Sequence, residues 1–250
     1  MAGHSHWANI KHKKAKTDAK RGKVWSKCAR AIMVAAKHGG SDPSANLALQ
    51  YAIDEARYEN MPRETIERAA KKGAGELGAI EYEVLRYEGY GPGGVAILCD
   101  TLTDNRTRLA ADMRLILTKY GGNLGATGSV AYMFEHKGVF TLEGDSVTED
   151  KLMEVAIEAG AEDVSLGDDI WTVTCAPAPF TQVKAALEKA GLTLQSAELS
   201  MLPQNLTTVT GDNLVKMMKL IDALEDQDDV QKVYTTLDAS AEELARVSGD

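Results

Sequence analysis

The sequence GVFTLEGDSVTEDKLMEVAIEAGAEDVSLGDDIWTVTCAPAPFTQVKAALEKAGLTLQSAELSM, residues 138–201, decides the fold that we expect for this chain. Its apolar periodicity, interrupted by glycine and proline, predicts a strand, a helix, two strands, a helix and a strand. This β-α-β-β-α-β order is typical of the ferredoxin-like arrangement. The predicted elements cover residues 138–143, 149–159, 162–166, 170–175, 180–190 and 193–201.

The segments on either side of this stretch are incomplete when each is considered alone. The preceding segment predicts strands at 82–88 and 95–101, a helix at 109–120 and a strand at 129–134. The following segment predicts a strand at 206–210, a helix at 212–225 and a strand at 230–236. We therefore expect a ferredoxin-like domain, residues 137–203, inserted into a discontinuous middle α/β domain formed by residues 81–136 and 204–250.

The N-terminal region predicts a third domain, a helical module within residues 1–80. One helix spans about 20–37, a second follows Ser41, and a third spans 63–72 with Pro62 at its start. Residues 2–19 have no apolar period and predict a basic arm that orders on binding. The expected fold class is α/β, in the α+β sense, with three domains.

Charge is distributed very unevenly along the chain. The protein has a net charge of −9, yet its first thirty residues contain nine Lys or Arg and only one acidic residue, Asp18. Because steering of a ligand depends on local potential, this end of the chain predicts a binding site for phosphate groups. A solvated terminus that only aids solubility is the alternative.

Trp7 and Trp25 lie among these bases, and aromatic residues interleaved with basic ones are typical of nucleic-acid binding. No side-chain order resembles a base-reading code, so we expect backbone-led binding and leave DNA and RNA equally open. The candidate nucleic-acid-binding residues are His4, His6, Trp7, Lys11, Lys13, Lys14, Lys16, Lys20, Arg21, Lys23, Lys27 and Arg30.

Two glycine-rich loops and one helix start form a candidate second surface. The loops GYGPGG, 89–94, and GGNLGATG, 121–128, suit a phosphate cradle or a plain turn, and we expect Thr103 or Asp104 to cap the helix between them. If the middle strands pair as expected, the three segments share one face. The candidate residues are Tyr90, Gly91, Gly93, Gly94, Asn105, Arg106, Arg108, Gly121, Gly122 and Asn123.

Catalytic and metal-binding patterns are poor. His4, His6 and His12 lack a nearby Cys or carboxylate to complete a metal site, and no nucleophile motif is present, so we expect no enzyme activity, metal or cofactor. The acidic cluster of residues 225–229 is interpreted as a solubilising helix end. Cys28, Cys99 and Cys175 form no CxxC pair and no 20-residue apolar span occurs, which predicts a cytoplasmic protein without a membrane partner and leaves oligomeric state open.

Six ordered motifs closely resemble the YebC family, which includes the mitochondrial translational activator of cytochrome oxidase. They are GHSHWANIKHKKAKTDAKRGK (3–23), GGSDPSAN (39–46), NMPRETIERAAKKG (60–73), YEGYGPGGVA (87–96), LTDNRTR (102–108) and GGNLGATGSVAYMF (121–134). The resemblance implies a three-domain α/β protein linked to nucleic acid in gene expression. The family's basic arm maps onto Lys11 to Lys23 and its glycine loops onto Gly91–Gly94 and Gly121–Gly128, whereas His6 stands where the family usually has Lys.

Three hypotheses of function follow. The first is a DNA-binding transcriptional regulator, the role by which family members are conventionally described. The second is a ribosome-associated translation factor that binds ribosomal RNA and relieves stalling, for example at proline runs. The third is a protein-interaction scaffold in which the ferredoxin-like domain binds a partner and the arm is incidental.

Overall fold

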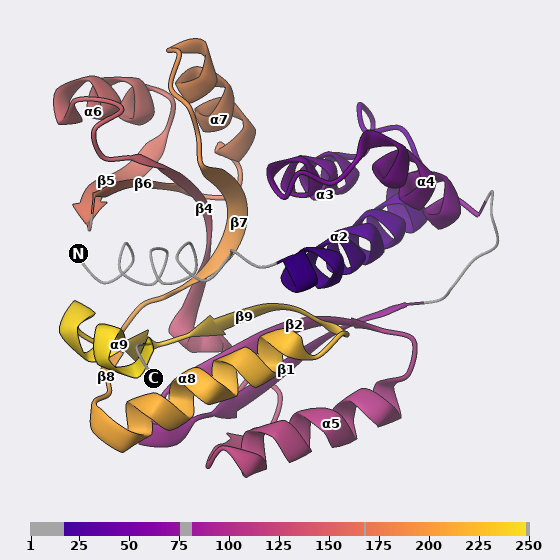
Figure 1. Cartoon of the computed structure of the whole chain (residues 1–250). Coiled ribbons are helices and arrows are strands. Elements are labelled where there is room, and N and C mark those ends of the chain that lie inside the picture. The colour runs from indigo at the N-terminus through magenta and orange to yellow at the C-terminus, as the bar shows by residue number, and fades with distance from the viewer. Residues whose placement is uncertain (1–17, 76–81, 168, 249–250) are drawn as a thin grey trace. The chain divides into compact units, whose positions relative to one another are not determined.

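A computed structural model describes residues 18–75, 82–167 and 169–248. The chain divides into two compact units (Figure 1). One contains Phe134–Leu206, and the other contains the described residues before Phe134 together with those after Leu206. Each unit has its own helices and sheet and is described separately below.

The first part of the larger unit is a module of three helices. Cys28, Ile32 and Ala36 lie one turn apart on the first helix and face a core to which Leu49 and Ile66 contribute. Asn46 ties the second helix to the first, because its side chain accepts from Leu49 N (3.1 Å) and donates to Ala35 O (2.8 Å) and Gly40 O (2.9 Å). The helices are α2 (Asp18–Gly39), α3 (Leu47–Tyr58) and α4 (Arg63–Gly73).

The same unit contains an antiparallel sheet with the strand order β3-β1-β2-β9. Strands β1 (Glu83–Tyr90) and β2 (Ala96–Thr103) form a hairpin, closed by the 3-10 helix η1 (Pro92–Gly94). The far edge of β2 pairs with β9 (Val230–Thr235), and the far edge of β1 pairs with the short β3 (Asn123–Leu124). The chain therefore returns to this sheet after passing through the other unit.

Helices α5 (Arg106–Lys119) and α8 (Gly211–Asp226) cover one face of this sheet. A Cβ atom on Gly89 would meet Leu117 of α5, and one on Gly91 would meet Met217 and Leu220 of α8. Gly91 continues the extended backbone of β1 by one residue (φ −98°, ψ −179°), so positions 89 and 91 point to the same side. Both helices therefore lie on that side, and Figure 1 shows α8 running along the strands. The remaining elements of the unit are η2 (Ala131–Met133), β8 (Thr207–Thr208), β10 (Leu237–Asp238) and α9 (Ala241–Ser248).

The smaller unit is a ferredoxin-like domain with the antiparallel strand order β5-β6-β4-β7. Its core includes Phe140 stacked on Phe180, with ring centroids 4.8 Å apart, and Gly138 lies where a Cβ would collide with the Phe180 ring. Its elements are β4 (Phe134–Glu143), α6 (Glu149–Glu158), β5 (Ala161–Gly167), β6 (Ile170–Cys175), α7 (Phe180–Lys189) and β7 (Ser196–Pro203).

The structure confirms the mixed α/β fold class and the insertion of the ferredoxin-like domain into the middle one. The strand predicted at 129–134 is wrong, because residues 131–133 form η2 and β4 begins at Phe134. The helix α9 and the short strands β3 and β10 were not predicted. The domain limits 1–80, 81–136 with 204–250, and 137–203 remain predictions. Within the described ranges, no helix is both long enough and apolar enough to cross a membrane.

Candidate nucleic-acid interface

The predicted phosphate-binding residues fall into three groups. His4, His6, Trp7, Lys11, Lys13, Lys14 and Lys16 lie outside the described residues. Lys20 and Arg21 lie in the first turns of α2, and for them only the backbone is described. The structure gives side-chain contacts for Lys23, Lys27 and Arg30.

Lys23, Lys27 and Arg30 lie on one side of α2, because their spacing of four and three residues matches the helical turn. All three side chains contact the protein's own chain at the end of α8 and in the turn that follows it. Lys27 Nζ donates to Glu225 O (2.6 Å), and Lys23 Nζ pairs with Asp226 Oδ1 (3.2 Å). Arg30 donates to Asp228 O and pairs with Asp229 Oδ1 (3.3 Å).

The end of α8 is a strong site for cations. The last carbonyls of any helix lack partners within the helix and form the negative end of its dipole. This helix has no basic residue in its last turn, and it ends on Glu225 and Asp226, which add negative charge at the same place. The bases of α2 therefore supply from outside the positive charge that α8 lacks. Burial lowers the pKa of Lys27, and Glu225 opposes that effect.

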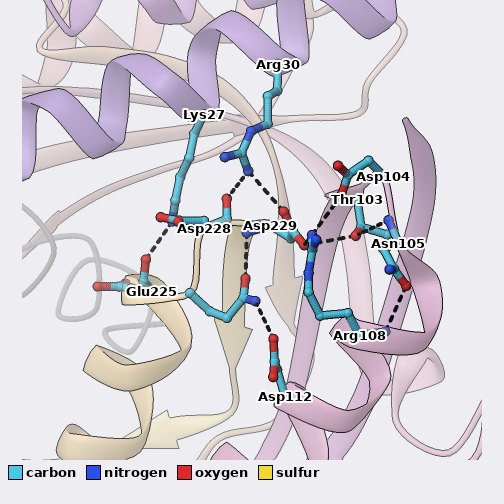
Figure 2. A network of polar contacts seen from close by, with 11 residues as sticks. Lys27, Arg30, Thr103, Asp104, Asn105, Arg108, Asp112, Glu225, Asp228 and Asp229 are labelled. Carbon is cyan, nitrogen blue, oxygen red and sulfur yellow. Dashed lines mark hydrogen bonds and ion pairs between the residues drawn. The ribbon is translucent and has the colours of Figure 1, made fainter. Parts of the chain in front are cut away.

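Asp229 is the centre of the polar network in Figure 2, where Arg30 and Arg108 reach it from two different helices. It is 5% exposed, and its Oδ2 accepts from Arg108 Nη2 (2.8 Å) and Thr103 Oγ1 (2.9 Å). Its backbone carbonyl accepts from Leu102 N (2.8 Å). The interpretation of residues 225–229 as a solubilising helix end is therefore wrong for Asp229, which links α2, α5 and β2.

Trp25 has a structural role in the helical module. Its indole Nε1 donates to Glu59 O (3.0 Å), and the ring packs against the core of the three helices. The bond joins α2 to the end of α3. Base stacking by Trp25 remains a prediction.

The two glycine-rich loops come together through Glu88, a residue that sequence reasoning missed. Glu88 is 4% exposed, and its carboxylate accepts from the backbone N–H groups of Gly128 (2.7 Å), Val130 (2.7 Å) and Ala131 (2.8 Å). Burial alone would raise its pKa, but these three bonds outweigh burial and lower it. The only sequence signal was an acidic residue directly before the glycine-rich loop.

These backbone bonds position the loops around β1. Gly125 N donates to Glu88 O (2.8 Å), and Tyr90 pairs with Asn123 in the β1–β3 ladder. Gly122 lies where a Cβ would come within 2.5 Å of Tyr90 O. Tyr90, Gly91, Gly121, Gly122 and Asn123 therefore share one end of the sheet.

Asn105, Arg106 and Arg108 lie elsewhere, so the expectation that all three segments share one surface is wrong. In the β1–β2 ladder, Tyr90 pairs with Ala96 while Thr103 pairs with Glu83 at the opposite end. The helix α5 has 14 residues, which separates its start from the glycine loops by about 20 Å. The predicted cap is also wrong, because Asn105 rather than Thr103 or Asp104 caps the helix by accepting from Arg108 N (3.0 Å).

The described residues offer little reactive chemistry. They contain no group of three His, Cys, Asp or Glu side chains arranged to hold a metal ion. Cys28, Cys99 and Cys175 are buried, and burial raises the pKa of Cys28 to about 12 and that of Cys175 to about 11. Such thiols are almost entirely protonated near neutral pH and are poor nucleophiles.

A helical module followed in the chain by mixed α/β domains is an arrangement that other proteins share. A family model described as the TACO1/YebC protein N-terminal domain matches residues 5–76, and one described as the TACO1/YebC second and third domain matches residues 82–237. The chain belongs to the TACO1/YebC family. The resemblance inferred from the six motifs is confirmed.

Relatives match along nearly the whole chain. A "Probable transcriptional regulatory protein" of Syntrophotalea carbinolica is 52% identical over 249 residues, which is 100% of both chains. One of Nitrosospira multiformis is 56% identical over 238 residues, covering 94% of this chain and 98% of the relative. The crystal structure of the conserved hypothetical protein Aq1575 from Aquifex aeolicus is similar with a TM-score of 0.85 and 46% identity, covering 96% of this chain and 99% of that one.

Proposed function

We propose that this protein is a non-enzymatic, nucleic-acid-binding regulator of gene expression that acts in the cytoplasm and binds phosphate backbones through its basic N-terminal residues. The observation that carries the proposal is the concentration of nine bases against one acid in the first thirty residues of an acidic protein. The names of the relatives, probable transcriptional regulatory proteins, support a role in transcription.

The arm is the part of the sequence best suited to this role. Lys11, Lys13, Lys14 and Lys16 precede α2, and their spacing is dense enough to displace several counterions from a nucleic acid. Lys23, Lys27 and Arg30 continue the same charge along α2, although they contact the end of α8. Binding through backbone phosphates needs no base-reading side chain.

The test is to change Lys11, Lys13, Lys14 and Lys16 together to Gln and to measure affinity for nucleic acid over a range of salt concentrations. If all four contact phosphates, the slope of log affinity against log salt becomes shallower by about 3.6 on duplex DNA or about 2.8 on single strands. The matched control changes four exposed lysines of α6, α7 and α8 to Gln, which gives the same net charge. Those residues are Lys151, Lys189, Lys216 and Lys219.

Equal slopes for the arm variant and the wild-type protein would contradict the proposal and would favour the scaffold hypothesis. Crosslinking in cells, with sequencing of both DNA and RNA fragments, decides between the two kinds of nucleic acid. Recovery of promoter DNA supports transcriptional regulation. Recovery of ribosomal RNA supports the alternative, a ribosome-associated translation factor.

A further inference from the structure

We infer that residues 225–229 act as an internal competitor of nucleic acid for the basic side of α2. This inference rests on the proposed function, because it assigns a regulatory contact to part of the proposed binding surface. The segment would hold Lys23, Lys27 and Arg30 against α8 when nucleic acid is absent. Phosphates would have to displace it before these three bases could contribute to binding.

The chemistry of the contact supports competition. Lysine and arginine bind a phosphate through the same N–H donors that they use toward a carboxylate or carbonyl oxygen. Lys23 and Lys27 already direct Nζ to Asp226 Oδ1 (3.2 Å) and Glu225 O (2.6 Å), so the protein takes up part of the charge and donor capacity of each ammonium, and a phosphate must compete with these acceptors for it. Arg30 is similarly occupied by Asp228 O and Asp229 Oδ1.

The exposure of the groups indicates that the contact can open. The Lys23 and Asp226 side chains are 48% and 64% exposed, and an ion pair that exposed contributes only about 0–1 kcal/mol. The side chains of Arg30 and Asp229 are only 19% and 7% exposed and form the less accessible end of the contact. A polyanion can therefore displace Asp226 from Lys23 first, without disrupting the buried hydrophobic core.

The segment can be weakened without touching the buried network. Glu225, Asp226 and Asp228 are exposed, and their change to Gln, Asn and Asn removes three negative charges while keeping the backbone carbonyls. Asp229, which also binds Arg108 and Thr103, is left unchanged. The matched control removes three exposed acids near helix ends of the other unit, with the same change in net charge. The control changes are Glu154→Gln, Glu158→Gln and Glu188→Gln.

The experiment measures the affinity of the wild-type protein, the triple variant and the control for a short mixed-sequence single-stranded RNA and for the matching duplex DNA. We expect the triple variant to bind at least about threefold more tightly than the control, because the binding-competent state is more populated. Its salt slope should also steepen, by up to about 2.1 on single strands or about 2.7 on duplex DNA if three more phosphates are contacted.

A second measurement follows the contact directly and does not depend on variants. A zero-length carbodiimide crosslink between Lys23 and Asp226, detected by mass spectrometry, should form in the free protein and diminish when the RNA is added at saturation. An unchanged crosslink would overturn the inference, as would identical slopes for the triple variant and the control.

A single exposed change, Asp226→Asn, gives a smaller version of the same test. It should steepen the salt slope by up to about 0.7 on RNA, the contribution of one additional lysine–phosphate contact.

The outcomes separate the two proposals. Binding by all three proteins with equal slopes contradicts only the competition and leaves the proposed function standing. Absence of binding by all three proteins contradicts the proposed function, and the competition fails with it.

Discussion

Glu88 shows how one side chain can fix a loop that sequence alone leaves undefined. Its carboxylate accepts from three backbone N–H groups between Gly128 and Ala131. The two residues that follow Ser129 were predicted to extend a strand, but their N–H groups bind this carboxylate and are not available for a sheet ladder. A pattern of apolar residues predicts strands well. It cannot show that the backbone N–H groups of such a segment donate to an acidic side chain distant in the sequence.

Changing Glu88 to Gln should lower the free energy of unfolding by about 3 kcal/mol, because charge-assisted bonds are lost and an amide N–H₂ faces backbone donors. Urea denaturation followed by circular dichroism measures the change. Glu83→Gln, an exposed change on the same strand, is the control and should stay within about 0.5 kcal/mol of the wild-type protein. A loss for Glu88→Gln no larger than for the control would contradict this account.

The stability supplied by Glu88 should depend on pH in a defined direction. Its pKa is lowered in the folded protein from the ordinary value of 4.5, so the folded state favours the charged carboxylate. The contribution is therefore fully present well above pH 4.5 and is lost as the pH falls through the lower, folded value. The stability difference between the wild-type protein and Glu88→Gln should be constant near neutral pH and should shrink below pH 4.5; a difference that grew on acidification would exclude the mechanism.

At the scale of elements, α2 and α4 approach each other closely at Gly73. A Cβ on Gly73 would lie 2.3 Å from Met33 O, which is backbone and cannot rotate away. Gly73→Ala should therefore push the helices apart and destabilise the protein by about 1–3 kcal/mol. Gly22→Ala on the same helix pair, where nothing lies within 4 Å, should instead stabilise by about 0.5–1 kcal/mol. Thermal unfolding of both variants checks the opposite signs.

The sequence predicted most elements because their periodicity is local. The β-α-β-β-α-β order of residues 138–201 and the return of β9 to the middle sheet were both foreseen. The start of α5 was misassigned because Thr103, Asp104 and Asn105 are all good capping residues, and backbone geometry decides which one acts. The short α9 was missed because it has only eight residues, fewer than the window over which helical periodicity is reliably recognised.

At the scale of the whole molecule, the contacts of the basic helix could not have been foreseen. The bases at 23–30 were correctly recognised as concentrated charge, but their partners lie about two hundred residues later in the chain. Sequence patterns report neighbours within a turn or a strand, and they do not report pairs that only folding brings together. The same limit concealed the burial of Asp229.

Asp229 joins several elements of the larger unit, so its loss should destabilise that unit as a whole. Asp229→Asn removes the carboxylate that pairs with Arg30 and one of the two that pair with Arg108, whose other partner is Asp104, and should lower the free energy of unfolding by about 3 kcal/mol. The control Asp228→Asn keeps the contact of its backbone carbonyl with Arg30 and should change stability by less than about 0.5 kcal/mol. Chemical denaturation of both variants measures the contrast, and equal losses would contradict the role of the Asp229 carboxylate.

The pairing of β2 with β9 has a consequence for the order in which the protein is made. The edge of β2 at Ile97 is covered only when Thr235 of β9 pairs with it. A growing chain therefore exposes this strand edge until residue 235 has been synthesised. The acidic turn that receives the bases of α2 also emerges late. During synthesis, the basic helix is therefore present before its intramolecular partner exists. The pairing of β2 with β9 joins distant segments of the chain, and such pairing is slow.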